Sequence, residues 1–254
     1  MSDDATSPAR ESSGVPAEPP AVARDPAGGF DTGAAITRSL LGWGVVVGPF
    51  YVVVSLAQAL TRDGFDLSRH ALSQLALGPG GWVQTVNLAL SGLMVVAAGI
   101  GIARALVPGR RVRLAGGLVA AFGVGMLGAA LFPTDPINGF PPGTEETMTA
   151  SGMLHLVLSG LGFLALGVGA ILTGGALARR AEALAGIARA SRVCGIVVLV
   201  AFVAGAAFGG TALGIALLWL AVLTGWAWLL AVCVTCYRRV VPHPDAARRA
   251  RGAA

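Results

Sequence analysis

Residues 37–60 read TRSLLGWGVVVGPFYVVVSLAQAL, a run with a single charge at its beginning. About 20 consecutive apolar residues are enough for a helix to cross the hydrocarbon core of a bilayer, so this run predicts a transmembrane helix. Further runs of this kind lie at 84–106, 112–132, 150–175, 192–210 and 213–236. The sequence therefore predicts an all-α polytopic transmembrane bundle of six helices.

The overall composition supports a membrane protein. The chain is 55% hydrophobic and only 12% charged, with a mean hydropathy of +0.74, whereas about a quarter of the residues of soluble domains are charged. All 18 basic residues are arginine, which together with abundant Ala, Gly and Val indicates a GC-rich bacterial genome. Because the arginines cluster in short loops, where they set membrane orientation, we expect no nucleic-acid partner despite the net charge of +5.

The arginine clusters predict the orientation. They lie in the connections 104–113 and 176–192 and at Arg238 and Arg239, and they mark the cytoplasmic side. The 133–149 loop carries only acidic charges, so we expect it to face outward. This places the chain in the bacterial inner membrane with both termini in the cytoplasm and the 61–83 loop outside. Arg62 and Arg69 in that loop oppose the trend and indicate another role.

The chain divides into three parts. Residues 1–36 are polar, Pro-rich and lack the apolar core of a signal peptide, which predicts a disordered cytoplasmic tail. Residues 37–236 form the predicted six-helix domain, and 237–254 an Arg-rich cytoplasmic tail. Cys233 and Cys236 form a C-x-x-C without a second pair or a nearby His, so they are interpreted as buried helix residues. No metal and no cofactor is predicted.

The first loop concentrates ionisable groups. Residues 61–70 read TRDGFDLSRH between two apolar runs. After Asp66, apolar positions recur through 67–77 and stop at Gly78-Pro79. This pattern predicts a short interfacial helix in the first outer loop, lying on the membrane surface.

Polar side chains inside three predicted helices recur at helical spacing, and each set forms one stripe. The stripes are Ser55, Gln58 and Arg62; Gln84, Asn87 and Ser91; and Thr147, Ser151, His155 and Ser159. Lipid offers no hydrogen-bond partner, so the stripes should face the bundle interior or a wet cavity. We expect the three helices to line a polar cavity that opens to the outside.

Loop residues at the same level complete the candidate site. Taken singly, Asp66 is expected to cap a helix, Asp63 to pair with Arg62, and His70 to lie at the interface. His155 lies inside a membrane helix, where an ionisable residue indicates function, with Asp135 or Asp66 as its expected partner. The catalytic candidates are His155, His70, Asp66 and Asp135. The predicted ligand-binding residues are Arg62, Asp63, Asp66, Arg69, His70, Gln84, Asn87, Asp135, Ser151 and His155.

A short internal similarity links the second and fourth helices. LALSGL at 88–93 matches LVLSGL at 156–161, and the glycines at 99 and 101 match those at 167 and 169. Duplication and chance both account for it, because such matches are common in helices rich in Ala, Gly and Leu. A duplication would make Asn87 and His155 equivalent positions.

Two blocks of sequence resemble a known family. The first is GFDLSRHALS at 64–73, followed by Gly78, Gly81-Trp82, Gln84 and Asn87; the second is FPTDP at 132–136, GFP at 139–141 and His155. Together they resemble the bacterial and archaeal membrane family known as domain of unknown function 998, over about residues 37 to 236. The resemblance implies a six-helix membrane fold. The family has no established activity, so it implies no catalytic residues.

Three functions remain open from the sequence. The first is binding or transport of a lipid or polar headgroup in an outward site, with Arg62 and Arg69 contacting an anion. The second is an outer-leaflet lipid-directed hydrolase, in which Asp66 or Asp135 orients a histidine base and a metal is optional. The chain is loosely similar to the hydrolase family that includes the alkaline ceramidases, but it has no His within 192–236.

The third function is an accessory subunit of a membrane complex. Membrane lipids are the expected partners in all three cases, and a membrane-protein partner and the oligomeric state stay open.

Overall fold

The structure, a computed structural model, describes residues 29–106 and 109–246. Contacts divide the chain into Asp31–Pro244 and a second unit formed by Met1–Phe30 with Asp245–Ala254. Only residues 29, 30, 245 and 246 of the second unit are described. Most of the predicted 1–36 tail and the end of the 237–254 tail therefore lie outside the described residues and stay predictions.

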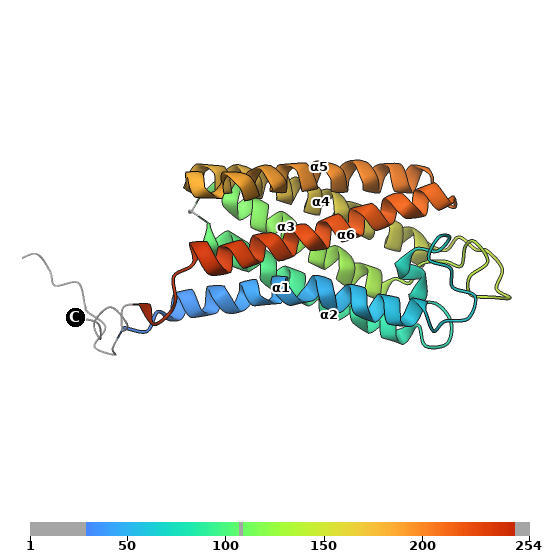
Figure 1. Cartoon of the computed structure of the whole chain (residues 1–254). Coiled ribbons are helices and arrows are strands. Elements are labelled where there is room, and N and C mark those ends of the chain that lie inside the picture. Colours follow the sequence, from blue (N-terminus) through green and yellow to red (C-terminus); the bar gives the residue numbers. More distant parts are fainter. Residues whose placement is uncertain (1–28, 107–108, 247–254) are drawn as a thin grey trace, which may run out of the picture. The chain divides into compact units, whose positions relative to one another are not determined.

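The unit Asp31–Pro244 is built from six long helices (Figure 1). They are α1 (Thr32–Ala59), α2 (Trp82–Ala105), α3 (Arg110–Leu131), α4 (Ala150–Arg180), α5 (Ala185–Ala207) and α6 (Ala212–Thr235). Each is long and apolar enough to cross a membrane. Within the described residues there is no strand, only an isolated bridge between Ile137 and Phe140. The predicted six-helix transmembrane fold is confirmed.

Helix ends differ from the apolar runs where arginines are present. The fourth run ends at residue 175, but α4 continues to Arg180; the fifth begins at 192, but α5 begins at Ala185 after a short 3-10 turn, η2 (Glu182–Leu184). Arginines are good helix formers, and their long stems can lie along apolar surface while the guanidinium stays in the interface. Hydropathy alone therefore underestimates the length of both helices.

The first loop does not contain the predicted interfacial helix over 67–77. Turns at 66–69 lead into a 3-10 helix, η1 (Leu72–Ala76), in which Leu72, Gln74 and Leu75 are buried. The Gln74 side chain accepts from the Ala71 N–H (2.9 Å) and donates to the Ile137 carbonyl (2.9 Å). These contacts attach η1 to the rest of the protein, so its apolar residues pack inward.

The six helices form a ring. Each packs against the next in sequence, and α6 packs against α1 to close the ring, while α4 and α6 barely touch. The segments 60–81, 132–149 and 208–211 lie at one end, here called the loop end. The start of α1 and the end of α6 lie at the other, the terminal end. In Figure 1, α6 runs beside α5 at the loop end and beside α1 at the terminal end.

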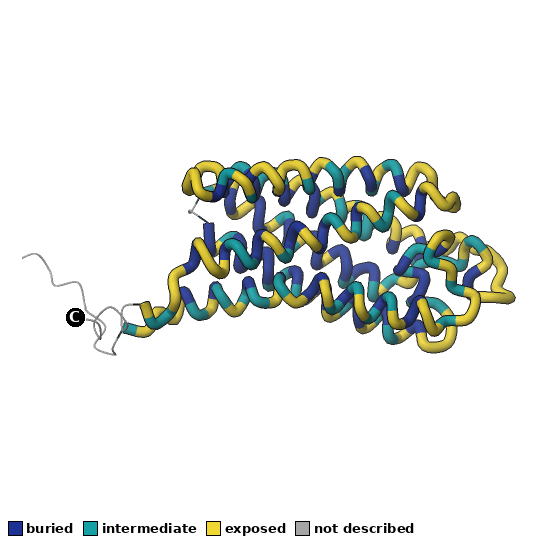
Figure 2. The backbone as a smooth tube through the Cα atoms, in the orientation of Figure 1, coloured by how far each residue is buried: buried dark blue, intermediate teal, exposed yellow. Residues whose placement is uncertain are grey.

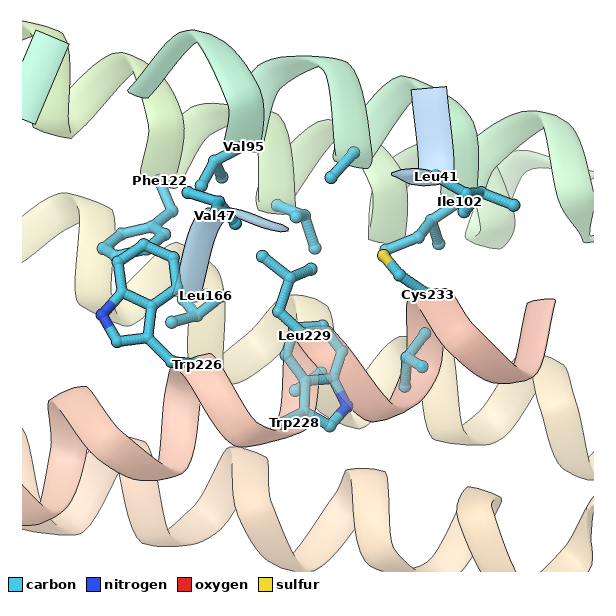
Figure 3. Close-up of a cluster of buried hydrophobic side chains, with 14 of the residues drawn as sticks. Leu41, Val47, Val95, Ile102, Phe122, Leu166, Trp226, Trp228, Leu229 and Cys233 are labelled. Carbon is cyan, nitrogen blue, oxygen red and sulfur yellow. The ribbon is translucent and has the colours of Figure 1, made fainter. Parts of the chain in front are cut away.

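Apolar side chains fill the ring where α1, α2 and α6 meet. Figure 3 shows Leu41, Ile102, Leu229 and Cys233 pointing toward one another, all essentially buried. A Cβ on Gly44 of α1 would collide with Cys233, which shows how closely α1 and α6 approach. The outer faces of the helices are exposed along their length (Figure 2) and carry many large apolar residues. Such faces suit contact with lipid.

Glycines bring neighbouring helices into close contact at two corresponding places. A Cβ on Gly99 of α2 would lie 2.6 Å from the carbonyl oxygen of Gly116 on α3. Likewise, a Cβ on Gly195 of α5 would lie 2.5 Å from the carbonyl oxygen of Gly167 on α4. Small residues at interfaces are the usual way in which membrane helices gain packing contacts.

Candidate functional site

A cavity of about 500 Å³ lies inside the ring toward the loop end. Its wall is apolar and rich in aromatic rings contributed by α1, α3, α4, α5 and α6. Phe163 stacks on Phe202 with ring centroids 4.5 Å apart, and Phe122 packs against Trp226 at 5.8 Å. Tyr51 packs against the other side of this group, 5.3 Å from Trp226. Apolar, aromatic-lined cavities of this size are typical of small-molecule sites.

Polar side chains border the cavity at the loop end. They are Ser73, Gln74, Thr134, Asn138, His155 and Ser159. None of the described residues that line the cavity is Asp, Glu or Arg. The cavity therefore combines an apolar body with an uncharged polar rim.

His155, in the second turn of α4, lines this cavity and is 3% exposed. Its Nδ1 lies 3.2 Å from the carbonyl oxygen of Ala129 and 2.9 Å from that of Phe132, at the end of α3. The last carbonyls of a helix have no partner inside the helix, so the imidazole supplies one. The predicted partner carboxylates do not bond to it: the Asp135 charge acts on His155 only through space.

His70 is buried too, but it fastens two loops together. Its Nδ1 accepts from the Asp66 backbone N–H (2.8 Å), and its Nε2 donates to the Asn138 carbonyl (3.0 Å). The ring packs between Phe65 and Phe140, with centroids 5.3 and 5.4 Å away. Both ring nitrogens are occupied and His70 does not line the cavity. This arrangement supports a structural role and leaves no nitrogen free for catalysis.

The carboxylates stabilise local structure. Asp66 accepts from both the hydroxyl (2.7 Å) and the N–H (2.8 Å) of Ser68, and these bonds hold the pKa of Asp66 below its ordinary value. Asp135 accepts from the N–H and the hydroxyl of Thr149, both at 2.7 Å, and Thr149 caps α4. Asp63 is exposed, and its side chain forms no hydrogen bond to any described residue. Ser151 donates to the Pro133 carbonyl (3.0 Å) outside the cavity.

The two loop arginines differ in environment. The Arg62 guanidinium donates to the carbonyls of Leu75 (3.2 Å) and Leu77 and lies 5.5 Å from the centre of the Phe140 ring. Arg62 thus holds the end of η1 in place. Arg69 is exposed, and within residues 29–106 and 109–246 its side chain has no hydrogen-bond partner. Neither lines the cavity, so a ligand there would not meet the predicted pair of anion contacts.

The stripes of α1 and α2 face each other and not the cavity. Gln84 Oε1 accepts from Ser55 (3.2 Å), Gln58 (3.0 Å) and Asn87 (3.2 Å). Asn87 also donates to Ser55 (3.1 Å) and to the Tyr51 carbonyl (3.2 Å). We call these residues, with Ser91, the polar network. The predicted cavity lined by all three stripes is thus corrected: two stripes bond to one another, and only the α4 stripe reaches the cavity.

The candidate residues therefore occupy separate places. No hydrogen bond connects the pair Asp66 and His70 to Asp135 or His155, although Asn138 links the two loops. Within residues 29–106 and 109–246, no group of three or more His, Cys, Asp or Glu side chains is placed to hold a metal ion. Of the predicted site residues, His155 alone lines the cavity.

Several residues of the site were not predicted from the sequence. The aromatic wall carries no periodic signal, because its rings come from different helices. Tyr51 could have been found, since it lies four residues before Ser55 on the same stripe. Asn138 could also have been found, because the dipeptide Asn138-Gly139 is typical of a tight turn. In the structure both residues have positive φ, 58° and 78°.

Comparison with known proteins agrees with this fold. No curated protein and no solved structure matches the chain. A family model does match residues 45–235, which is most of the chain and nearly all of the six-helix unit. The chain therefore belongs to the membrane family described as "Protein of unknown function (DUF998)".

Proposed function

We propose that this protein binds a neutral amphiphile, with the apolar chain in the cavity and the polar end at the rim. The observation that carries this proposal is the contrast between the aromatic wall and the uncharged polar rim. A charged group placed there would lack a counter-ion in a medium of low dielectric constant, which is costly. A hydrocarbon chain needs no such partner.

Exposure of the wall supports entry from the bilayer. Leu156 on α4 and Ala206 on α5 both line the cavity and are exposed on the helix surfaces. A lipid chain could therefore enter between these helices without crossing an aqueous phase. We propose further that the loop end faces outward from a bacterial inner membrane, as the arginine distribution favours.

Hydrolysis has less support than binding. A catalytic histidine base is usually oriented by a carboxylate, which also stabilises the imidazolium that forms. Nδ1 of His155 instead contacts two backbone carbonyls, and Ser159, one turn further along α4, forms no hydrogen bond with His155. These carbonyls orient the ring but carry no full negative charge.

Filling the cavity tests the proposal. A Cβ on Gly160 would meet only Phe202, at 3.8 Å, so Gly160→Leu should place its side chain in the cavity without displacing backbone. We expect this variant to bind a pyrene-labelled alkane about tenfold more weakly, measured by quenching of tryptophan emission in detergent micelles.

The matched control is Gly117→Leu. Gly117 is exposed on α3 and has nothing within 4 Å of its Cβ position, so this leucine should project outward. Its binding should equal that of the wild type. Wild-type binding by a folded Gly160→Leu protein, with an unchanged melting temperature, would contradict the proposal.

A further inference from the structure

The protonation of His155 follows from its neighbours. The carbonyl oxygens of Ala129 and Phe132 can only accept hydrogen bonds, so Nδ1 of His155 must carry the proton that both receive. In a neutral imidazole the other nitrogen then bears a lone pair and can only accept. Nε2 of His155 is thus a hydrogen-bond acceptor.

This acceptor has no partner among the residues that the structure describes. Within that part of the chain Nε2 forms no hydrogen bond, although the His155 side chain is only 3% exposed. The two carbonyls occupy the Nδ1 edge of the ring, and His155 lines the cavity. An acceptor left unpaired in an apolar cavity costs free energy, and lipid cannot supply a donor. A donor on a molecule in the cavity would satisfy it.

The other polar residues at the rim indicate which kind of ligand group could donate to Nε2 of His155. Gln74 is occupied on both sides of its amide, by Ala71 and Ile137, and the Asn138 amide donates to the Arg69 carbonyl. The remaining polar side chains at the rim are the hydroxyls of Ser73, Thr134 and Ser159, which can both donate and accept. In the aromatic wall, the Tyr51 hydroxyl accepts from Gln84, and Trp226 Nε1 is a donor with no partner among the described residues. No described lining residue is a carboxylate that would pair with an ammonium head, or an arginine that would pair with a phosphate.

We propose that Nε2 of His155 accepts a hydrogen bond from a neutral hydroxyl group at the head of the bound amphiphile. The proposal rests on the proposed function, since it requires a ligand in the cavity. It adds a ligand class: long-chain alcohols and lipids with a free hydroxyl, in preference to ethers and esters that lack a donor. A site built around an unpaired polar group discriminates against ligands that leave it unpaired.

A pair of probes isolates this bond. Hexadecanol and its methyl ether differ in the hydroxyl proton and one methyl group, and each can compete with the pyrene-labelled alkane in the same micelles. We expect the wild-type protein to bind the alcohol about tenfold more tightly than the ether. In His155→Phe the two probes should bind equally, and His155→Gln, which keeps an acceptor, should restore part of the preference.

His70→Phe is the matched control. It removes a buried histidine that bonds two loops outside the cavity, so it should lower the melting temperature but keep the preference for the alcohol. If His70→Phe and His155→Phe both abolish the preference, the effect comes from general loosening of the fold and the assignment to Nε2 is overturned.

A measurement on the wild type covers the case in which His155→Phe does not fold. The chain has three histidines, so ¹⁵N-histidine spectra can be assigned with single variants. Nε2 of His155 should resonate as an unprotonated nitrogen and shift on addition of hexadecanol but not of the ether. A protonated Nε2, or equal responses to both probes, would overturn the inference. If even the pyrene-labelled alkane does not bind the wild type, the proposed function itself has failed.

Discussion

The two buried histidines differ in which ring nitrogen carries the proton. His70 accepts at Nδ1 and donates at Nε2, so it joins the first loop to the 132–149 loop. His155 donates at Nδ1, and its Nε2 has no partner in the described part of the chain. From the sequence, the position of His155 inside a membrane helix indicated a functional role. The predicted pairing with Asp135 or Asp66 is not formed, because His155 bonds to backbone carbonyls. That pairing depended on the path of the loop, which brings Asp135 to the cap of α4 instead.

Arg62 provides a prediction at the same scale. Its guanidinium bonds two carbonyls at the end of η1, and Arg62→Met keeps the length of the stem but removes these donors. We expect the free energy of unfolding to fall by about 1 to 3 kcal/mol, because two part-buried carbonyls lose their partners. Thermal unfolding in detergent measures this, with Arg69→Met as the control because the Arg69 side chain forms no hydrogen bond. Equal melting temperatures for the two variants would contradict the assigned role.

At the scale of the helices, their number could be predicted from the sequence, but the contacts between them could not. The number of helices followed from apolar runs, since a bilayer demands a fixed length. The sequence does not show which groups each polar stripe faces. That depends on how each helix is rotated about its axis, and packing decides the rotation. The similarity between 88–93 and 156–161 gains support from packing: the corresponding residues Gly99 and Gly167 each contact a glycine on the following helix. If the two segments are duplicates, Asn87 and His155 are equivalent positions, one in the polar network and the other in the cavity lining.

The polar network should contribute to stability and not to binding. Gln84→Met preserves side-chain length but removes the single oxygen that accepts from three side chains. We expect a loss of about 1 to 3 kcal/mol in unfolding free energy in detergent, with binding of the pyrene-labelled alkane unchanged. Thr85→Val is the control, since the Thr85 hydroxyl bonds only to the carbonyl of Gly81, the N-cap residue of α2. Lost binding with unaltered stability would instead place Gln84 in the ligand site.

At the scale of the whole six-helix unit, the ring is closed at the terminal end by polar contacts. The Asp31 N–H donates to the Pro244 carbonyl (2.9 Å), and Arg38 donates to the carbonyls of Tyr237 (2.7 Å) and Val241 (3.0 Å). The Arg38 guanidinium also lies 3.8 Å from the centre of the Tyr237 ring. Because the number of transmembrane helices is even, α1 begins and α6 ends on the same side of the membrane.

Cysteine labelling tests which side that is. Glu145→Cys lies in the exposed loop at the loop end, and Ala183→Cys lies in the exposed η2 turn at the terminal end. In a Cys194→Ser background, whose other cysteines are buried, a membrane-impermeant maleimide should label Glu145→Cys in intact cells. It should label Ala183→Cys only after the cells are broken. The reverse pattern would invert the proposed orientation.

Apolar packing holds α5 in the ring. It packs mainly against α4 and α6, and among the described residues no hydrogen bond joins an α5 side chain to another helix. Lipid tails are as apolar as the side chains they would replace, so moving α5 outward exchanges one apolar neighbour for another. It follows that the lateral pressure of the acyl chains opposes such a movement. We therefore expect the width of the cavity to depend on the thickness and fluidity of the bilayer.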